Sequence, residues 1–430
     1  LSSLSISGAS NIGANVTTSG AQSYGGTVTL SHDVLLTATA SPITFAQTVD
    51  GDGVLLRALD LRTSGTVTFE RSIGSLVPLQ RLSTAAVQSG AYSRPLGRTV
   101  MGAGVGSVRT AGDQVYGDLE FNVASNVQRD TDHVQVTVNT EDGSTANIYP
   151  LRLRSTSGGL NFLGVVEGGV GAKTHKRSLS LDAATQVTFN DRLGFDAVTS
   201  RNGNILANYT RHYGIYRLDV TAPIINVLSN ITTYEHMNFR GHVFIGGHTG
   251  QAETRYLLSL DPAVNFFGRV DGHGPVEGLY TLDARAIGFD TSVLSSSSHP
   301  GQPVVTFSSD VGASRALAGL QTQVAVVENM QNLRGSSADI VGGVGARQQA
   351  GISSPTAANA GTVSFLGNVT TTGGQTHFAN RFVVAGAGPR GTEFNGTAFD
   401  LAIGGGGIVN PDGGRPRIRF STNPTGETLR

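Results

Sequence analysis

The sequence predicts an all-β protein, an elongated parallel β-solenoid (β-helix) with coils of about 20–27 residues. Two observations carry this prediction: a strand tripeptide that recurs along the chain, and an abundance of glycine between the recurrences. Glycine numbers 58 among 430 residues, while charged residues make up 14% and hydrophobic residues 38%. Such a chain can bury a core, and its small and β-branched residues favour strands joined by tight turns over helices.

The recurring tripeptide reads apolar, small polar, phenylalanine. It occurs as Ile43-Thr44-Phe45, Val67-Thr68-Phe69, Leu160-Asn161-Phe162, Val187-Thr188-Phe189, Met237-Asn238-Phe239, Val264-Asn265-Phe266, Val305-Thr306-Phe307 and Val363-Ser364-Phe365. Successive side chains of a strand point to opposite faces, so the apolar residue and the Phe point inward. We therefore expect these eight Phe side chains to be buried in strands and to stack from coil to coil.

A corner or bulge is expected directly after each Phe. An aliphatic residue follows four positions later, as in Val49 and Ile73, but the position between is glycine or polar. An unbroken strand would point that position into the core. In the units that begin at Phe69, Phe266 and Phe307, further aliphatic residues follow at +10 and +13.

A second motif, Thr-x-Gly-x-Gln-x-Tyr, starts at Thr18 and Thr110, and a third copy at Thr371 carries His377 in place of Tyr. Adjacent Phe units lie 24, 27 and 27 residues apart. This spacing favours a single repeat array over residues 1–430, with the best-matching repeats at 11–87, degenerate repeats at 88–400 and a C-terminal edge or junction at 401–430. We expect little helix.

The repeats resemble those of large bacterial exoproteins of the filamentous-haemagglutinin type, which are β-helical adhesin and matrix proteins. The resemblance is closest from Asn11 to Val87 and rests on Val16 to Tyr24, Ile43 to Phe45, Thr63 to Phe69 and Leu79 to Thr84. It implies a structural or adhesive extracellular protein of a surface fibre, sheath or biofilm matrix, located outside the cell or on a bacterial cell surface. It supplies no catalytic residue.

The composition of the chain limits the kinds of partner that it is expected to bind. The chain has no cysteine, which excludes disulfides and thiolate metal sites. Its formal net charge of -1 gives no electrostatic reason to bind nucleic acid, and its apolar runs are too short for membrane insertion. Surface glycans or matrix components, and further copies of the chain, are the partners we expect.

Five places invite a chemical interpretation. Asp50-Gly51-Asp52-Gly53 and Asp271-Gly272-His273-Gly274 suggest calcium or metal loops, but each lacks the further spaced acids of such a loop, so tight turns are favoured. His236, His242 and His248 are six residues apart, and the glycine clusters at 102–106 and 404–407 open no helix. We therefore predict no catalytic, cofactor-binding or metal-binding residue, and no cofactor.

Five Asn-x-Thr sequences, at Asn15, Asn208, Asn230, Asn368 and Asn395, match the glycosylation pattern, but the composition of a Thr- and Asn-rich strand protein produces such matches readily. The alternative to a structural protein is a β-helical glycan-processing enzyme or phage-spike-like protein, which would gather carboxylates on one sheet. A passenger stalk that presents another domain is a third possibility.

The two ends of the array are expected to be junctions. Leu1-Ser2-Ser3-Leu4 matches Leu79-Gln80-Arg81-Leu82 and Leu317-Ala318-Gly319-Leu320, so the chain enters in the middle of a repeat. Either more sequence precedes it, or another subunit supplies the missing strand and the protein assembles end to end. Ile418-Arg419-Phe420 is a candidate for the complementary edge.

Overall fold

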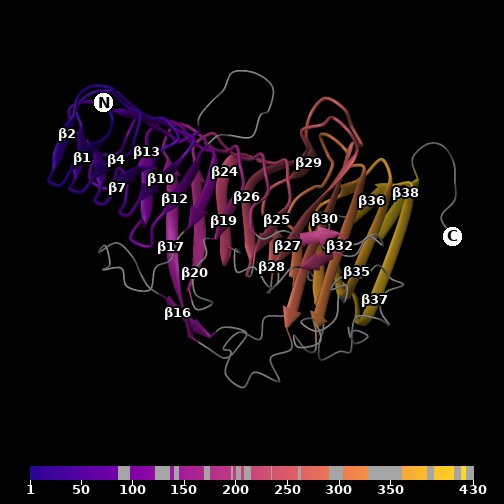
Figure 1. Cartoon of the computed structure of the whole chain (residues 1–430). Helices are drawn as coiled ribbons and strands as arrows, with labels where there is room; N and C mark the ends of the chain where they lie inside the picture. Colours follow the sequence, from indigo (N-terminus) through magenta and orange to yellow (C-terminus); the bar gives the residue numbers. More distant parts are fainter. Residues whose placement is uncertain are drawn as a thin grey trace.

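The protein is a parallel β-solenoid, as predicted (Figure 1). The computed structural model describes residues 1–85, 97–121, 136–139, 145–168, 175–194, 197–199, 205–207, 215–233, 235–259, 263–289, 304–327, 361–384, 392–410 and 418–422. Within these residues every regular element is a strand. No helix of the described residues is long and apolar enough to cross a bilayer. The coils stack from the N-terminal end to the C-terminal end of the molecule, and three parallel sheets run along the stack.

The first sheet contains β1 (Leu4–Ile6), β4 (Gln22–Tyr24), β7 (Ile43–Phe45), β10 (Thr66–Phe69), β12 (Arg98–Met101), β15 (Asp118–Phe121), β19 (Val166–Gly168), β25 (Ile231–Thr233), β27 (Glu253–Ser259), β30 (Tyr280–Phe289), β32 (Gly319–Val327), β35 (Gly374–Val384) and β37 (Ala398–Val409). Leu193 bridges β19 and β25. The second sheet contains β2 (Ser10–Ile12), β5 (Val28–Leu30), β8 (Val49–Gly51), β13 (Ser107–Thr110), β17 (Thr145–Ser155), β20 (His175–Ala183), β24 (Arg217–Val227), β26 (Met237–Ile245), β28 (Ala263–Phe266), β31 (Val304–Phe307), β33 (Thr362–Phe365) and the later parts of β35 and β37.

The third sheet contains β3 (Val16–Thr18), β6 (Val34–Ala38), β9 (Ala58–Thr63), β11 (Arg81–Ser83), β14 (Gln114–Tyr116), β18 (Leu160–Phe162), β21 (Gln186–Phe189), the later parts of β24 and β26, β29 (Val270–Gly272), β34 (Val369–Thr370), β36 (Thr392–Gly396) and β38 (Ile418–Thr422). Two antiparallel pairs depart from the parallel pattern: β16 (Val136–Asn139) with β17, and β22 (Ala197–Thr199) with β23 (Ile205–Ala207).

Coil length is regular at first and then varies. In the first sheet Leu4, Gln22, Ile43 and Val67 are successive partners, 18, 21 and 24 residues apart. Farther along, the partners Thr322 and His377 are 55 residues apart. The number of residues between stacked partners therefore varies along the chain, while the strands still pair in register.

The eight predicted Phe side chains are fully buried, and each lies in a strand, which confirms the tripeptide prediction. They form three separate stacks. Tyr24, Phe45 and Phe69 stack in the first sheet; Tyr116, Phe162 and Phe189 in the third; Phe239, Phe266, Phe307 and Phe365 in the second. The ring centroids of Phe266 and Phe307 are 4.8 Å apart with nearly parallel planes. The Phe unit therefore moves from one sheet to another along the stack.

The predicted break after the Phe is present. Strands β7, β10, β18, β21, β28, β31 and β33 all end at their Phe. β26 instead continues past Phe239, and there the pairing with β24 shifts register between Thr221 and Ile224. A side chain at Gly241 would overlap the carbonyl oxygen of Ala222, so glycine is required where the two coils approach.

The aliphatic residues at +10 and +13 are buried in two of the three copies that share this spacing. Leu79, Leu82, Leu317 and Leu320 are buried. The copy that begins at Phe266 differs, because Val276 is 56% exposed and Leu279 is only partly buried. Val276 lies in a loop after β29 in which Gly274 and Gly278 have positive φ. The loop swings outward, and Leu282 takes the core position opposite Leu320.

The Thr-x-Gly-x-Gln-x-Tyr motif is a hydrogen-bonded corner inside the core. Gln114 is buried, and its Nε2 donates to the Val108 carbonyl and to Thr110 Oγ1, and at 2.9 Å to the carbonyl of Arg154 in the next coil. Tyr116 Oη donates to Gln114 Oε1 at 2.8 Å. The copy at Thr18 has the same arrangement around Gln22 and Tyr24. The motif thus provides hydrogen-bond partners for polar groups at this corner that would otherwise be buried and unpaired.

The two sequence motifs are stacking partners in neighbouring coils. The second Leu of each Leu-x-x-Leu lies opposite the Gln of the motif: Leu4 with Gln22, Leu82 with Gln114, and Leu320 with Gln375. The carbonyl of the first Leu accepts a backbone hydrogen bond from the residue after the motif Thr in all three copies. This geometry confirms the predicted match of residues 1–4 to 79–82 and 317–320.

Candidate functional site

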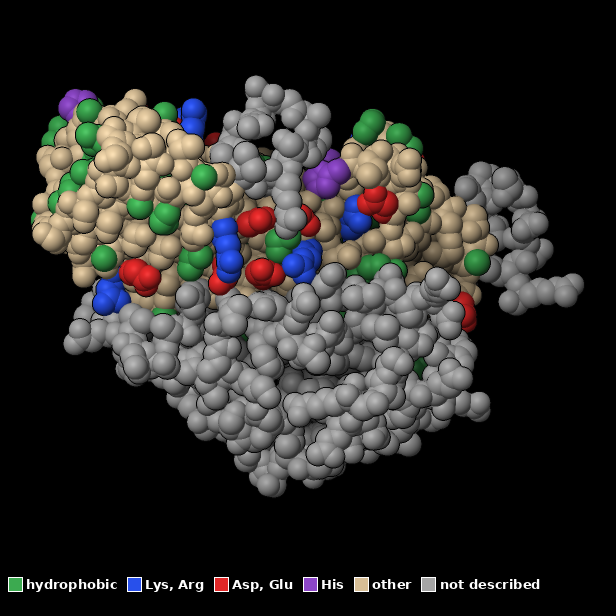
Figure 2. Space-filling model, in the orientation of Figure 1, with side chains coloured by type: hydrophobic (Ala, Val, Ile, Leu, Met, Phe, Trp, Pro, Cys, Tyr) green, Lys and Arg blue, Asp and Glu red, His purple; other side chains and the backbone are tan. Residues whose placement is uncertain are grey.

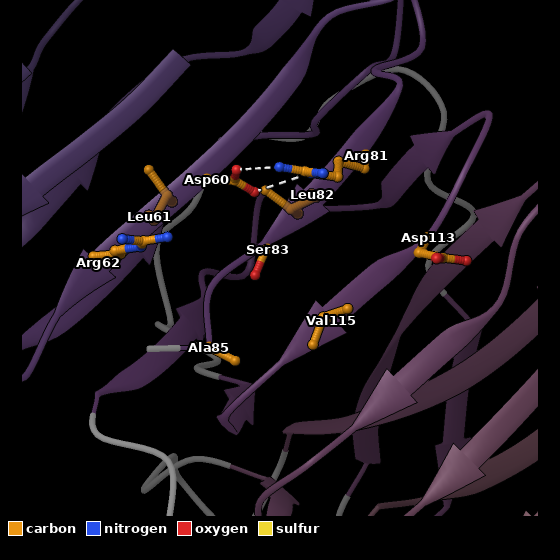
Figure 3. Close-up of a pocket in the computed structure, with 9 residues that line it drawn as sticks. All are labelled: Asp60, Leu61, Arg62, Arg81, Leu82, Ser83, Ala85, Asp113 and Val115. Atoms are coloured by element: carbon orange, nitrogen blue, oxygen red, sulfur yellow. Dashed lines mark hydrogen bonds and ion pairs between the residues drawn. The ribbon is translucent and has the colours of Figure 1, made fainter. Parts of the chain in front are cut away.

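A pocket of about 290 Å³ lies on the outer side of the third sheet, across β9, β11 and β14 (Figure 3). Its lining is Asp60, Leu61, Arg62, Arg81, Leu82, Ser83, Ala85, Asp113 and Val115. Residues alternate along these strands, so Leu59 and Leu61 face the core while Asp60 and Arg62 face out. Outward positions from three successive coils therefore form most of the pocket, and the buried Leu61 and Leu82 complete its lining.

An ion pair forms one wall of the pocket. Arg81 Nε donates to Asp60 Oδ1 at 3.2 Å, and Arg81 Nη2 donates to Asp60 Oδ2 (Figure 3). The hydrogen bond with Asp60 raises the pKa of Arg81. Asp113 has a structural role, since its Oδ1 accepts the backbone N–H of Gly159 at 2.8 Å. Arg62 is exposed and forms no ion pair within the described part of the chain.

This arrangement is suited to holding a polar ligand. Arg62 and the Ser83 hydroxyl are hydrogen-bonding groups beside the apolar side chains of Ala85 and Val115. Sequence reasoning did not find this pocket. The signal available was the outward Asp60 and Arg62 in one strand and Arg81 and Ser83 in another, but their adjacency depends on coil registration.

The two candidate calcium or metal loops act as clamps between coils. Asp50 Oδ1 accepts the N–H groups of Leu76 and Val77 in the next coil, at 2.8 and 3.3 Å. Asp271 Oδ1 accepts those of Ser314 and Arg315 in the same way, at 3.0 and 3.2 Å. The shared Val-Asp-Gly-x-Gly sequence thus encodes one structural device.

The second acid of the first loop is also engaged. Asp52 accepts a hydrogen bond from Arg57 Nη2 at 2.7 Å, and this interaction lowers the pKa of Asp52 to about 2. In the described part of the chain, no three His, Asp or Glu side chains gather as metal ligands do.

Replacing Asp50 by alanine should lower the free energy of unfolding by about 1–3 kcal/mol, because two backbone donors beside a buried site lose their acceptor. Asp182 is the matched control. It pairs with Arg152 and Arg154 on the surface, so Asp182→Ala should cost about 1 kcal/mol or less. Urea unfolding followed by circular dichroism measures both, and equal effects would contradict the clamp.

The three histidines do not come together. His242 Nε2 lies 2.6 Å from Asp271 Oδ2. His236 lies near Asp219 and Glu235, at 3.9 and 3.8 Å, and His248 contacts the backbone carbonyl of Asn190. Each histidine thus has its own partners.

The glycine clusters are explained by coil stacking and strand pairing. A side chain at Gly104 would overlap the backbone carbonyl oxygen of Glu70 in the preceding coil, so this position needs glycine, whereas the atom nearest to a side chain at Gly102 is the end of the flexible Glu70 side chain. The run at 404–407 lies within β37. Neither cluster opens a phosphate-binding helix in the described residues.

Three of the Asn-x-Thr sequences share a structural role. The side-chain oxygens of Asn15, Asn230 and Asn368 accept the N–H groups of Leu35, Tyr256 and Glu393 in the next coil, at 2.8, 3.1 and 2.9 Å. Asn395 instead accepts from Gln375 through its backbone carbonyl at 2.8 Å. Asn208 lies outside the described residues. In the first three cases the Asn side chain connects two coils just before a strand that begins with an apolar residue, Val16, Ile231 or Val369.

Comparisons with protein families, with curated proteins and with solved structures find no match to this chain.

Proposed function

We propose that this chain is a structural or adhesive extracellular repeat protein that forms part of a surface fibre, sheath or biofilm matrix and assembles end to end. One observation carries the proposal: a single ladder of partners in the first sheet runs without a break from Leu4 to Leu401. Each coil adds one strand spacing to this ladder, so the fold produces length. Length is the property that a fibre requires.

The outer surface supports a role in assembly or adhesion. Outward polar residues form ladders of their own: Asn238 Nδ2 donates to Asp219 Oδ1 at 2.8 Å, and Asn265 Nδ2 donates to Asn238 Oδ1 at 2.9 Å. Most of the described surface in Figure 2 is uncharged, and the acidic and basic groups in its middle are interspersed. A surface of this kind offers hydroxyl and amide groups to glycans or to matrix.

Electron microscopy of the purified chain tests the fibre, and binding of the chain to immobilised matrix polysaccharides tests adhesion. Filaments or sheaths, or saturable binding to one polysaccharide class, are expected. The rival function is a glycan-processing enzyme. Release of reducing ends from a polysaccharide, lost in the Asp113→Asn variant, would favour that enzyme and contradict the proposal.

Arg62 offers a sharper test of adhesion. Arg62→Ala should weaken polysaccharide binding by about tenfold if the pocket on the third sheet takes part, since a good charged contact contributes on the order of 1–2 kcal/mol. Arg154→Ala is the matched control, because Arg154 is an outward arginine of the second sheet away from the pocket lining.

A further inference from the structure

An exposed aromatic ring lies beneath an arginine at the corner where the second sheet meets the third. Phe267 directly follows the last residue of β28, and 44% of its surface is exposed. The guanidinium carbon of Arg240, in the preceding coil, lies 4.2 Å from the centroid of this ring. A cation above an aromatic face is attracted by the electrons of the ring, so each side chain holds the other in place. Among the exposed large hydrophobic residues of the described chain, Phe267 is the one aromatic.

Two arginines at this corner are not neutralised by a carboxylate. Arg240 and Arg269 are both exposed, and neither forms an ion pair with a residue that the structure describes. Other outward arginines of the second sheet are paired, since Arg152 and Arg154 both contact Asp182. The corner therefore presents two guanidinium groups with N–H donors for a ligand.

The acids beside Arg269 are engaged in contacts between coils. Asp271 has no exposed surface, and its Oδ1 accepts two backbone N–H groups of the next coil. Asp310 is the neighbour of Arg269 in the next coil, and its Oδ1 accepts the N–H of Asn368 at 2.8 Å. Because these carboxylates are bound to backbone donors, the guanidinium groups remain accessible to an anion from solution.

A histidine of fixed orientation and an exposed aliphatic side chain border the two arginines. His242 lies beside Arg269, since the next residue along β26 donates its N–H to the Arg269 carbonyl. The Nε2 atom of His242 lies 2.6 Å from Asp271 Oδ2, which holds the imidazole in one orientation. Ile224 is the Cα partner of His242 in the preceding coil and is 40% exposed. The corner thus combines apolar surface with polar and cationic groups.

An acidic polysaccharide matches this combination of groups. A guanidinium binds a carboxylate or a similar oxyanion through paired N–H donors. The exposed part of the Phe267 ring offers an apolar surface to the C–H groups of a sugar ring. Arg240 and Arg269 belong to neighbouring coils, which are about 4.8 Å apart, so one extended sugar chain can contact both.

Single-stranded nucleic acid fits this corner less well. Its binding depends on a basic groove along the phosphates and on several aromatic rings that stack on successive bases. Within the described residues, this corner has one exposed aromatic ring, and the chain as a whole has a formal net charge of -1. These observations favour a carbohydrate over a nucleic acid.

We propose that Arg240, Phe267 and Arg269 form a binding surface for an acidic polysaccharide. The two guanidinium groups bind carboxylates or sulfates of the polysaccharide, and the Phe267 ring packs against a sugar ring. His242 and Ile224 extend this surface along the corner. The inference rests on the proposed adhesive function and specifies its ligand class and its contact residues.

Binding of the purified chain to immobilised polygalacturonate and heparin tests the proposal, with dextran as the neutral polysaccharide. Saturable binding to at least one acidic polysaccharide, weakened by added salt, and no binding to dextran are expected. The double variant Arg240→Ala with Arg269→Ala should bind about tenfold more weakly or worse, since it removes two charged contacts. Phe267→Leu keeps an apolar side chain without the ring and should bind about threefold more weakly. Polygalacturonate carries carboxylates and heparin carries mainly sulfates, so their comparison identifies the anion.

Arg152→Ala with Arg154→Ala is the matched control. This variant also removes two exposed arginines of the second sheet and changes the net charge equally, but its arginines are paired with Asp182. Its affinity should stay within about twofold of that of the unchanged chain. Circular dichroism compares the strand content of all variants. If the variant at Arg240 and Arg269 loses its strand spectrum, Arg240→Gln with Arg269→Gln takes its place.

Three results would overturn the site: no binding to either acidic polysaccharide, equal losses in the two double variants, or tighter binding of oligothymidylate than of both polysaccharides. Failure of the site and failure of the proposed function are distinguishable. A chain that forms filaments, or binds a neutral polysaccharide, without binding the acidic ones would lose the site and keep the structural or adhesive role. A chain that binds through Arg240 and Arg269 and cleaves the polysaccharide would keep the site and contradict the proposed function.

Discussion

Replacing Phe266 by alanine is expected to lower the free energy of unfolding by about 3–5 kcal/mol. The side chain has no exposed surface, and its ring stacks between Phe239 and Phe307, with centroids 5.3 and 4.8 Å away. Truncation removes the middle of a stack and leaves a cavity that two neighbouring coils line. Because each coil is stabilised mainly by its neighbours, the loss affects both adjacent interfaces.

Phe267 is the matched control, since it is the next residue and points outward with 44% of its surface exposed. Its ring contacts the Arg240 guanidinium at 4.2 Å, so Phe267→Ala should cost about 1 kcal/mol or less. Urea unfolding followed by circular dichroism compares the two variants. Similar losses for both positions would show that the Phe stack does not stabilise the coils as inferred.

Acid is expected to destabilise the protein through His377. The imidazole is fully buried, and burial lowers the pKa of His377 to about 3. Its Nδ1 lies 2.9 Å from Thr322 Oγ1, while Nε2 has no partner in the described part of the chain. Since the histidine of the unfolded chain has its ordinary pKa of about 6.5, the unfolded state binds the additional proton below that pH.

Protonation of His377 therefore favours the unfolded state. Its effect on the free energy of unfolding is absent above about pH 6.5 and grows as the pH falls toward 3. Between pH 7 and pH 4 the loss should be on the order of 3 kcal/mol, at about 1.4 kcal/mol for each pH unit below 6.5. Urea unfolding at both pH values measures it.

His377→Tyr isolates this contribution, because it removes the titrating group and restores the residue found in the other two copies of the motif. Gln375 Oε1 has no partner among the described residues, whereas Gln22 and Gln114 accept a hydrogen bond from Tyr24 and Tyr116. Carboxylates titrate equally in both proteins, so the difference between them reports the histidine. An unchanged pH dependence in the variant, or in His377→Phe, would contradict the assignment.

The fold class and the inward residues were predictable from the sequence because they depend on local periodicity. The alternation of Val67, Thr68 and Phe69 determines which side chains face the core, whichever sheet the strand joins. The break after each Phe was predictable for the same reason. The Gln motif was visible as a repeat, but its role was not, since Gln114 bonds to Arg154 forty residues away.

What only the tertiary structure decided is registration between coils. Whether a Phe unit lies in the first, second or third sheet depends on the lengths of the preceding coils and of the connections between their strands. The stacked partners Thr322 and His377, which are 55 residues apart, illustrate how much these lengths vary. The pocket at Asp60 and Arg81, the clamp of Asp50 on Leu76 and the outward loop at Val276 all depend on that sum. Local pattern specifies the face of a strand, whereas its neighbours are set by loop lengths that carry no periodic signal.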